Sequence, residues 1–207
     1  ATDNLQSNTN LTQRDKEQLV NEISKASIRL NQQVENLLNI SRLESGHIKP
    51  KADWCDITEL VYDVVKRVEE NNPGRKIHIS INQHLPLCSL DKGMLDQVIY
   101  NLLSNAAIHT ESGTRIDISV TCPADILNII VEDTGKGFAG VELKDVFDKF
   151  SRSKDLNASN SGLGLSIVKG FTEAMSGNVA LEKTNSHGSK FVISIPVKTS
   201  FPKVADL

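Results

Sequence analysis

The feature that most constrains this chain is a strand-like run that ends in an aspartate followed by glycines. Residues 126–132 read ILNIIVE, and Asp133 follows directly, ahead of Gly135 and Gly137. The run predicts a buried strand, and the glycines allow a ligand to approach the backbone closely. A carboxylate at that strand end accepts a hydrogen bond from an exocyclic amine such as that of adenine, whereas it repels the carbonyl of guanine. The segment therefore predicts a purine site that selects adenine.

The same glycines form a G-x-G-x-x-G pattern with Gly140, and this pattern also occurs in dinucleotide-binding turns. That interpretation needs a helix opened by the glycines and then a second strand that ends in an acid about 20 residues further on. Asp155 has the spacing, but no strand-like apolar run precedes it. The context therefore argues against a dinucleotide fold.

The segment 94–110, MLDQVIYNLLSNAAIHT, predicts a helix with one apolar stripe and one polar stripe. The polar stripe consists of Gln97, Asn101, Asn105 and His109. A solvated face is one interpretation, but Asp96 is the only charged residue within this helix before its final histidine, and exposed helix faces usually carry Lys and Glu. We therefore expect the amides to face a hydrated internal cavity, where their oxygens could hold Mg²⁺.

Two further segments have features of phosphate binding. The segment 138–161 is polar and has glycines at both borders, and Lys149, Arg152 and Lys154 are cations inside it. It is either a surface loop or a lid whose cations reach phosphate oxygens when it closes. After it, SGLGLSIVKG places Gly162 and Gly164 at a helix start. Free N–H groups favour phosphate there, although glycines at this position also serve packing.

Residues 12–45 predict one long helix, with Thr12 as its N-cap and Gly46 just past its end. A seam recurs along it in steps of three and four, formed by Leu19, Ile23, Ala26, Leu30, Val34, Leu37 and Ser41. This spacing indicates packing against a partner helix, and the alternative is a helix that packs on its own domain. We favour an exposed pairing surface, because GHIKPKADW after the helix has the composition of a linker.

Helices and strands alternate irregularly in the rest of the chain. We expect a helix from Asp56, a strand over KIHISI, strands near 115–121 and 126–132, a helix over 162–175, and strands near 178–183 and 189–196. The strand pairs look mostly antiparallel. The predicted fold class is α+β: a mixed, largely antiparallel sheet with helices on one face, preceded by the long helix.

Composition excludes several classes of protein. The chain has 207 residues, of which 39% are hydrophobic, so it can form one or two domains with a core. Its net charge of -3 gives no sign of a nucleic-acid surface. The three separated cysteines, Cys55, Cys88 and Cys122, form no C-x-x-C and predict reduced thiols. No apolar run has the length of a membrane span, and the absence of an initial Met suggests a piece of a longer protein.

In order and spacing, these segments resemble the four sequence boxes of the ATP-binding domain of sensor histidine kinases, which has the Bergerat fold. DQVIYNLLSNAAIHT resembles the N box, DTGKGF the G1 box, VFDKFSRS the F box and SGLGLSIVKG the G2 box. LNQQVENLLNISRLESG resembles the second helix of the dimerisation and phosphoacceptor domain, so the resemblance covers essentially the whole chain. ADWCDITELV and HLPLCSLDKGMLDQVIYNLL are also similar to the KdpD-type potassium-sensing subfamily.

The resemblance implies roles for individual residues. Asn105 would be the principal Mg²⁺ ligand, with Asn101 beside the metal and the phosphates, and Asp133 would bind the adenine amino group. Arg152, helped by Lys149, would neutralise charge on the γ-phosphate, so the implied catalytic residues are Asn101, Asn105 and Arg152. The set implied to bind ATP is Asn101, Asn105, His109, Asp133, Gly135, Gly137, Phe138, Lys149, Phe150, Arg152, Gly162, Leu163, Gly164 and Leu165.

The chain also departs from the family pattern. Ile108 stands where the N box often has a phosphate-binding Lys, and Asn160 stands where the G2 box commonly begins with Gly. Water-directed relatives carry a Glu at the position of Asn101, and its absence suits transfer to a histidine. An H box surrounds none of the chain's histidines, which are His47, His78, His84, His109 and His187. We therefore expect the phosphoacceptor His on a helix that precedes Ala1.

The function implied by the resemblance is transfer of the ATP γ-phosphate to that His and then to an Asp of a response regulator, with ATP and Mg²⁺ as cofactors. The fragment alone would not autophosphorylate. Expected domains are the second half of a helical hairpin with its linker (1–50), the ATP-binding domain (51–200) and a tail (201–207). Expected partners are a receiver domain and a second copy of the parent, without nucleic acid, and the domain would be cytoplasmic in an inner-membrane kinase. The alternatives are an ATP-binding regulatory module without kinase activity and a water-directed ATPase of this fold.

Overall fold

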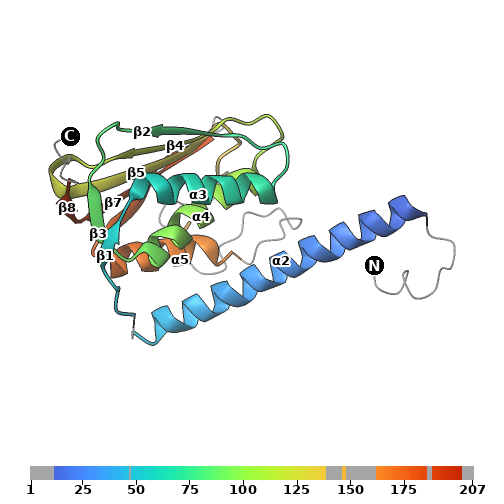
Figure 1. Cartoon of the computed structure of the whole chain (residues 1–207), viewed down its shortest axis with the longest axis horizontal. Helices are drawn as coiled ribbons and strands as arrows, with labels where there is room; N and C mark the ends of the chain where they lie inside the picture. The colour runs from blue at the N-terminus through green and yellow to red at the C-terminus, as the bar shows by residue number, and fades with distance from the viewer. Residues whose placement is uncertain (1–11, 47, 139–145, 148–161, 186–187, 202–207) are drawn as a thin grey trace, which may run out of the picture.

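The computed structural model describes residues 12–46, 48–138, 146–147, 162–185 and 188–201. A long helix, α2 (Gln13–Glu44), precedes an α/β unit that contains helices α3 (Ile57–Asn71), α4 (Lys92–His109) and α5 (Gly164–Ala174). Figure 1 shows the three shorter helices on one face of a sheet, with α2 running past them on the side away from the sheet.

The main sheet has five strands in the order β2-β4-β5-β7-β6. Their bounds are β2 (Ile77–Ile81), β4 (Ile116–Thr121), β5 (Ile126–Asp133), β6 (Asn178–Asn185) and β7 (Gly188–Pro196). β2 and β4 pair in parallel, whereas the β4–β5, β5–β7 and β6–β7 pairs are antiparallel. The predicted fold class, a mixed and largely antiparallel sheet with helices on one face, is confirmed. β5, which delivers Asp133, lies in the middle of this sheet.

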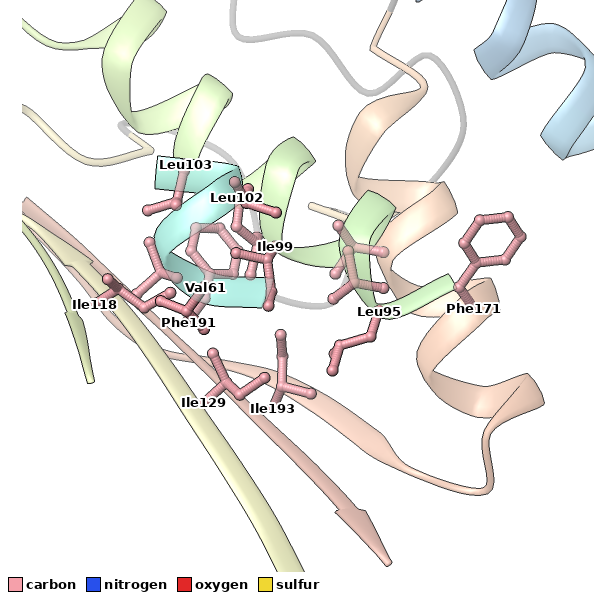
Figure 2. Close-up of a cluster of buried hydrophobic side chains, with 14 of the residues drawn as sticks. Val61, Leu95, Ile99, Leu102, Leu103, Ile118, Ile129, Phe171, Phe191 and Ile193 are labelled. Carbon is pink, nitrogen blue, oxygen red and sulfur yellow. The ribbon is translucent and has the colours of Figure 1, made fainter. Parts of the chain in front are cut away.

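Alternate residues of the central strands build the core. Along β5 every second side chain is buried, because successive residues of a strand point to opposite faces. Figure 2 shows Ile129 and Ile193 pointing from the strands toward Leu95 and Ile99 of α4. Full burial of one such side chain contributes about 1.5–3 kcal/mol, so this packing fixes the position of α4 over the sheet.

A second, smaller sheet was not predicted from the sequence. It consists of β1 (Asp53–Cys55), β3 (Leu87–Leu90) and β8 (Lys198–Ser200), all antiparallel, in the order β1-β3-β8. The assignment of GHIKPKADW to a linker was therefore wrong at its C-terminal end, where Asp53 and Trp54 belong to β1. Strands of three or four residues are too short to show a period, and these exist through pairing with distant segments.

The long helix is confirmed, with its expected N-cap. Thr12 and Asp15 form a capping box: the Asp15 N–H donates to Thr12 Oγ1 at 3.2 Å, and the Thr12 N–H donates to Asp15 Oδ2 at 3.0 Å. In the described part of the chain, no helix combines the length and the apolar character needed to cross a membrane.

The apolar seam of α2 is exposed, as predicted. Leu30 is 61% exposed and Leu37 is 57% exposed. A different face of α2, with Asn36 and Ile40 buried, turns toward the domain. There the Leu43 side chain covers α5, and a Cβ built at Gly170 would lie 2.6 Å from Leu43 Cδ1. The domain therefore holds α2 through one face and leaves the seam uncovered.

Candidate nucleotide site

The start of α4 is fixed by Asp91, which orients the whole helix. Asp91 Oδ1 accepts from the Met94 N–H at 3.0 Å, and Oδ2 accepts from the Lys51 N–H at 2.8 Å. Such capping satisfies N–H groups that lack a partner within the helix. With its apolar stripe packed on the sheet, α4 turns the stripe that bears Asn101 and Asn105 toward α5.

The two asparagines of α4 lie against the first residue of α5. Asn101 is only 6% exposed, and its Nδ2 donates to the Gln97 carbonyl at 2.8 Å. A Cβ built at Gly164 would lie 3.1 Å from Asn101 Oδ1 and 3.7 Å from Asn105 Nδ2. Glycine at this position therefore lets the start of α5 approach both amides closely. The structure brings together three of the predicted residues here.

The start of α5 faces these amides. Leu163 is its N-cap and makes no side-chain capping bond. The Leu163 carbonyl accepts from the Ile167 N–H at 3.1 Å and from Ser166 Oγ at 2.8 Å. The positive end of the helix dipole thus faces the Asn101 side, where an anion is favoured. The predicted helix began at Gly162, but α5 begins two residues later, because Gly162 has a positive φ of 66°.

Asp133 lies at the end of β5 and is 8% exposed. Its Oδ1 accepts from the Gly135 N–H at 2.8 Å, and the backbone N–H and hydroxyl of Ser189 also donate to its carboxylate. Burial raises the pKa of Asp133 above its ordinary value of 3.8, and the bonds from Gly135 and Ser189 oppose that rise. Asp133 is thus a buried, oriented carboxylate, and it lies at the end of the strand, where the sequence placed it.

The segment after Asp133 packs against the C-terminal end of α4. A Cβ built at Gly135 would lie 2.6 Å from Thr110 Cγ2 and 2.9 Å from Asp133 Oδ1, so only glycine fits without a shift. Gly137 has a positive φ of 63°. The Phe138 ring contacts Phe191 of β7 edge to face, with 5.9 Å between centroids. This geometry explains why the segment needs glycines where the sequence has them.

Sequence reasoning missed three residues that shape this end of the site. Ser189 reaches Asp133 through the β5–β7 register, which no local pattern reveals. Thr110 packs on Gly135, and its Oγ1 donates to the Ala106 carbonyl at 2.6 Å. Arg75 donates to the carbonyls of Thr110 and Glu111 and so ties the end of α4 to the turn before β2. The only sequence signal of Arg75 was its place in the NNPGR turn.

The two groups of site residues, one around Gly164 and one around Gly135, lie at opposite ends of one stretch of α4. Asn101 and Asn105 meet Gly164 at one end, and Thr110 meets Gly135 and Asp133 at the other. From residue 101 to residue 110 the helix rises by about 13 Å. His109 lies between them at the surface, and desolvation lowers the pKa of its imidazole. Lys149, Phe150 and Arg152 lie outside the described residues.

Two of the predicted residues serve packing in this structure. Leu163 is 1% exposed and belongs to the hydrophobic core, and Leu165 is half-buried against the same core.

A cavity of about 300 Å³ opens one helical turn before Asn101, between α2, α3 and α4. It is lined by Ile28, Asn31, Gln32, Glu35, Arg67, Asn71, Gln97 and Tyr100. Of the polar stripe of α4, Gln97 lines this cavity. Asn101 and Asn105 are not among its lining residues.

Comparison with known proteins identifies the class of this fold and site. Residues 90–199 match the family described as histidine kinase-, DNA gyrase B- and HSP90-like ATPase. The chain belongs to this family and carries the ATP-binding domain found in histidine kinases.

Individual relatives are sensor proteins. The chain is 31% identical over 185 residues to the sensor protein KdpD of Clostridium acetobutylicum, covering 87% of this chain and 20% of that protein. It is 28% identical over 184 residues to the alginate biosynthesis sensor protein KinB of Pseudomonas aeruginosa, covering 86% of this chain and 30% of that protein. KdpD is thus one of several sensor types that match, and the chain spans only a minor part of each of these two relatives.

Solved structures show the same fold. Full-length ShkA in complex with AMPPNP superposes with a TM-score of 0.75 at 24% identity, covering 94% of this chain and 41% of that one. At this identity the likeness concerns the fold alone. It extends over nearly the whole chain, including the long helix α2 that precedes the α/β unit.

Proposed function

We propose that this chain is the ATP-binding catalytic domain of a two-component sensor histidine kinase, joined to the second helix of its dimerisation hairpin. The observation that carries the proposal is that α4 borders two groups of residues. Asn101 and Asn105 meet Gly164 at one place, and about 13 Å further along α4 its C-terminal end meets Gly135 and Asp133. One end offers neutral amides and a helix N-terminus, which suit phosphates. The other offers a buried carboxylate acceptor, which suits the amino group of adenine.

The residues present fit an ATP–magnesium pair. Asn101 commits its Nδ2 to the Gln97 carbonyl, which leaves its Oδ1 directed at the start of α5. Amide oxygens are hard ligands of the kind Mg²⁺ accepts, so Asn105 and Asn101 would hold the ion. When bound, the ion would neutralise phosphate charge. Gly162 and Gly164 would lie along the phosphates, Gly135 and Gly137 along the base, and Arg152 and Lys149 would add positive charge at the γ-phosphate.

The reaction we propose is transfer of the γ-phosphate to a histidine on a separate helix, and from there to an aspartate of a response regulator. Phosphoryl transfer depends chiefly on positioning and electrostatic stabilisation, and we propose that the buried Asn101 and the start of α5 supply groups for both. The parent kinase would act as a dimer and hold this domain on the cytoplasmic side of an inner membrane. Residues 1–50 would belong to the hairpin and linker, and residues 51–200 to the ATP-binding domain.

Calorimetry with two variants tests the binding site. Asn105→Ala should weaken Mg²⁺–ATP binding about tenfold or more, equivalent to about 1.4 kcal/mol, and leave adenosine affinity unchanged. Asp133→Ala should weaken both ligands, because it removes the contact to the base. Ser104→Ala, on α4 beside the polar stripe, is the matched control. Undiminished ATP affinity in folded Asn105→Ala and Asp133→Ala proteins would exclude this site.

Phosphotransfer is tested by adding a second chain that carries an intact H-box helix, together with γ-labelled ATP. Label should appear on the histidine of the added chain and not on this chain incubated alone. Label on any histidine of this chain, or steady release of phosphate into water, would contradict the proposed reaction.

A second candidate is a nucleotide-binding regulatory module without kinase activity. Ile108 favours it, because this position often carries a phosphate-binding lysine in the family and here presents a 41% exposed apolar side chain. In that case ATP affinity would equal adenosine affinity and would not respond to Mg²⁺. The same calorimetric titrations therefore separate the two candidates.

A further inference from the structure

The turn after Asp133 carries an ion pair that joins it to the end of α4. Residues 135–137 read Gly-Lys-Gly, so Lys136 is the only one of the three with a side chain that can anchor the stretch. The glycines on either side of it allow many backbone conformations. Lys136 Nζ lies 2.6 Å from Oε1 of Glu111, which follows the helix. The pair thus attaches a stretch that its own backbone does little to fix.

Glu111 is itself held in place through its main chain. Its carbonyl accepts from the Arg75 guanidinium and from the Thr114 N–H, the latter at 3.1 Å. The carboxylate that meets Lys136 therefore extends from an anchored backbone. The hydrogen bond and the charge of Lys136 lower the pKa of Glu111 below its ordinary value of 4.5, so the carboxylate is ionised at neutral pH.

The same turn orients the carboxylate of Asp133. The Gly135 N–H donates to Asp133 Oδ1 at 2.8 Å, and Lys136 is the next residue. Thr110, which precedes Glu111, packs on Gly135, since a Cβ built there would lie 2.6 Å from Thr110 Cγ2. Release of Lys136 from Glu111 would free the adjacent glycines, so the bond from Gly135 to Asp133 would be made for less of the time.

We propose that Lys136 and Glu111 are positioning residues for adenine binding, because their ion pair holds the turn on the end of α4 and so keeps Asp133 oriented toward the base. This inference rests on the proposed role of Asp133. A loop that is already held in its binding conformation loses less entropy when the ligand binds. Both side chains are mostly exposed, 84% for Lys136 and 76% for Glu111, and exposed pairs are weak and screened by salt. The expected effect on adenosine affinity is therefore about two- to fivefold.

The first test needs no nucleotide and measures the exchange of amide hydrogens with water by NMR in the whole chain. Glu111→Gln removes the charge and keeps the main-chain bonds of residue 111. In this variant the Gly135 amide should exchange faster than in the wild-type chain. The Thr134 amide, which donates to the Arg115 carbonyl at 3.1 Å, is the internal control and should exchange at an unchanged rate. An unchanged rate for Gly135 would overturn the proposal.

The second test is a double-mutant cycle on adenosine affinity with Glu111→Gln, Lys136→Gln and the double variant. Each single change should weaken binding about two- to fivefold, and the double change should weaken it no further. Reversal of both charges, Glu111→Lys with Lys136→Glu, should restore the affinity, which a merely structural role of either side chain would not allow. Concentrated salt should abolish the effect of the single changes, since adenosine is uncharged and screening acts on the pair.

The matched control is the same cycle on Lys92 and Glu59, an exposed pair near the start of α4 with 3.9 Å between its charged atoms. These changes should leave adenosine affinity unaltered. Additive effects of the Lys136 and Glu111 changes would overturn the positioning role alone. So would their lack of effect in a protein whose adenosine affinity still falls with Asp133→Ala. If Asp133→Ala also has no effect, the proposed function fails together with this inference.

Discussion

At the scale of single residues, Asp133 shows how a binding role conflicts with stability. Its carboxylate is buried, and this raises its pKa despite bonds from Gly135 and Ser189. A folded-state pKa above the unfolded value means that the protonated form stabilises the fold. That stabilisation is complete below the ordinary pKa of 3.8 and is lost as the pH rises through the raised value. The ionised acceptor is therefore kept at a cost to folding.

The first prediction concerns the pH dependence of binding through Asp133. Adenosine affinity should fall on acidification at a higher pH than an ordinary carboxyl would give, because protonation places a hydrogen on the acceptor. Adenosine is the ligand of choice, since it has no phosphate to titrate. Affinity measured by calorimetry over a pH series should show this step, and the Asp133→Ala protein should lack it. A wild-type profile identical to that of the variant would contradict the role of Asp133.

Gly164 supplies a second prediction at the residue scale. An added Cβ would lie 3.1 Å from Asn101 Oδ1, close enough to displace the amide, while alanine suits a helix better than glycine by about 1 kcal/mol. Gly164→Ala should therefore keep or raise the unfolding temperature but lower Mg²⁺–ATP affinity roughly tenfold, or about 1.4 kcal/mol.

Gly93→Ala is the matched control for this substitution. Gly93 also lies in the first turn of a helix, but its nearest contact for a Cβ is Asp91 Oδ1 at 3.4 Å. This control should gain stability without any change in ATP affinity. Equal ATP affinity in the Gly164 and Gly93 variants would show that the start of α5 does not border the ligand.

At the scale of elements, α4 is the part that joins both ends of the site. Asp91 fixes its start, the sheet holds its apolar stripe, and Arg75 holds the backbone just past its end. The carbonyls that Arg75 binds belong to Thr110 and Glu111, and Thr110 in turn packs on Gly135. The adenine end of the site therefore depends on a contact made by the turn before β2.

Arg75→Ala should lower the free energy of unfolding by about 1.5–3 kcal/mol, the range for hydrogen bonds that involve a charged group. It should also weaken adenosine binding, since the end of α4 loses its anchor. Urea denaturation and calorimetry give the two quantities. Lys76→Ala is the neighbouring control: its ion pair with Glu69 spans 3.3 Å, and its side chain is 82% exposed, so the change should cost little. An equal effect of both substitutions would contradict the anchoring role.

At the scale of the whole molecule, α2 presents an uncovered apolar seam. The face of α2 with Asn36 and Ile40 rests on the domain, while Leu30, Val34 and Leu37 are about half exposed or more. An apolar stripe of this extent on a long helix favours pairing with another helix. We propose that this seam pairs with the same seam of a second copy of the chain.

We expect the chain to self-associate in a concentration-dependent manner through this seam. Leu30→Glu combined with Leu37→Glu should shift the protein to monomer, because charges would be buried in the pair. Sedimentation equilibrium measures the change, and Gln33→Glu, an exposed polar position on the same helix, is the control. ATP affinity should stay the same in the double variant. A monomeric wild-type chain at all concentrations would contradict the prediction.

The sequence by itself determined the long periodic elements and the chemistry at their ends. α2 has an apolar repeat in steps of three and four, α4 has one apolar and one polar stripe, and β5 is a strand-like run that ends in Asp133, so local spacing sufficed for them. The resemblance on four short motifs then implied the family, and the family match confirmed it.

Only the tertiary structure decided which distant residues meet. The small sheet, the Ser189 bonds to Asp133 and the Arg75 anchor all join segments at least 33 residues apart. Short strands carry no measurable period, and a cross-strand register leaves no mark on either strand alone. These contacts arise from packing of the whole chain, because burial of the apolar faces fixes the register and thereby selects the polar neighbours.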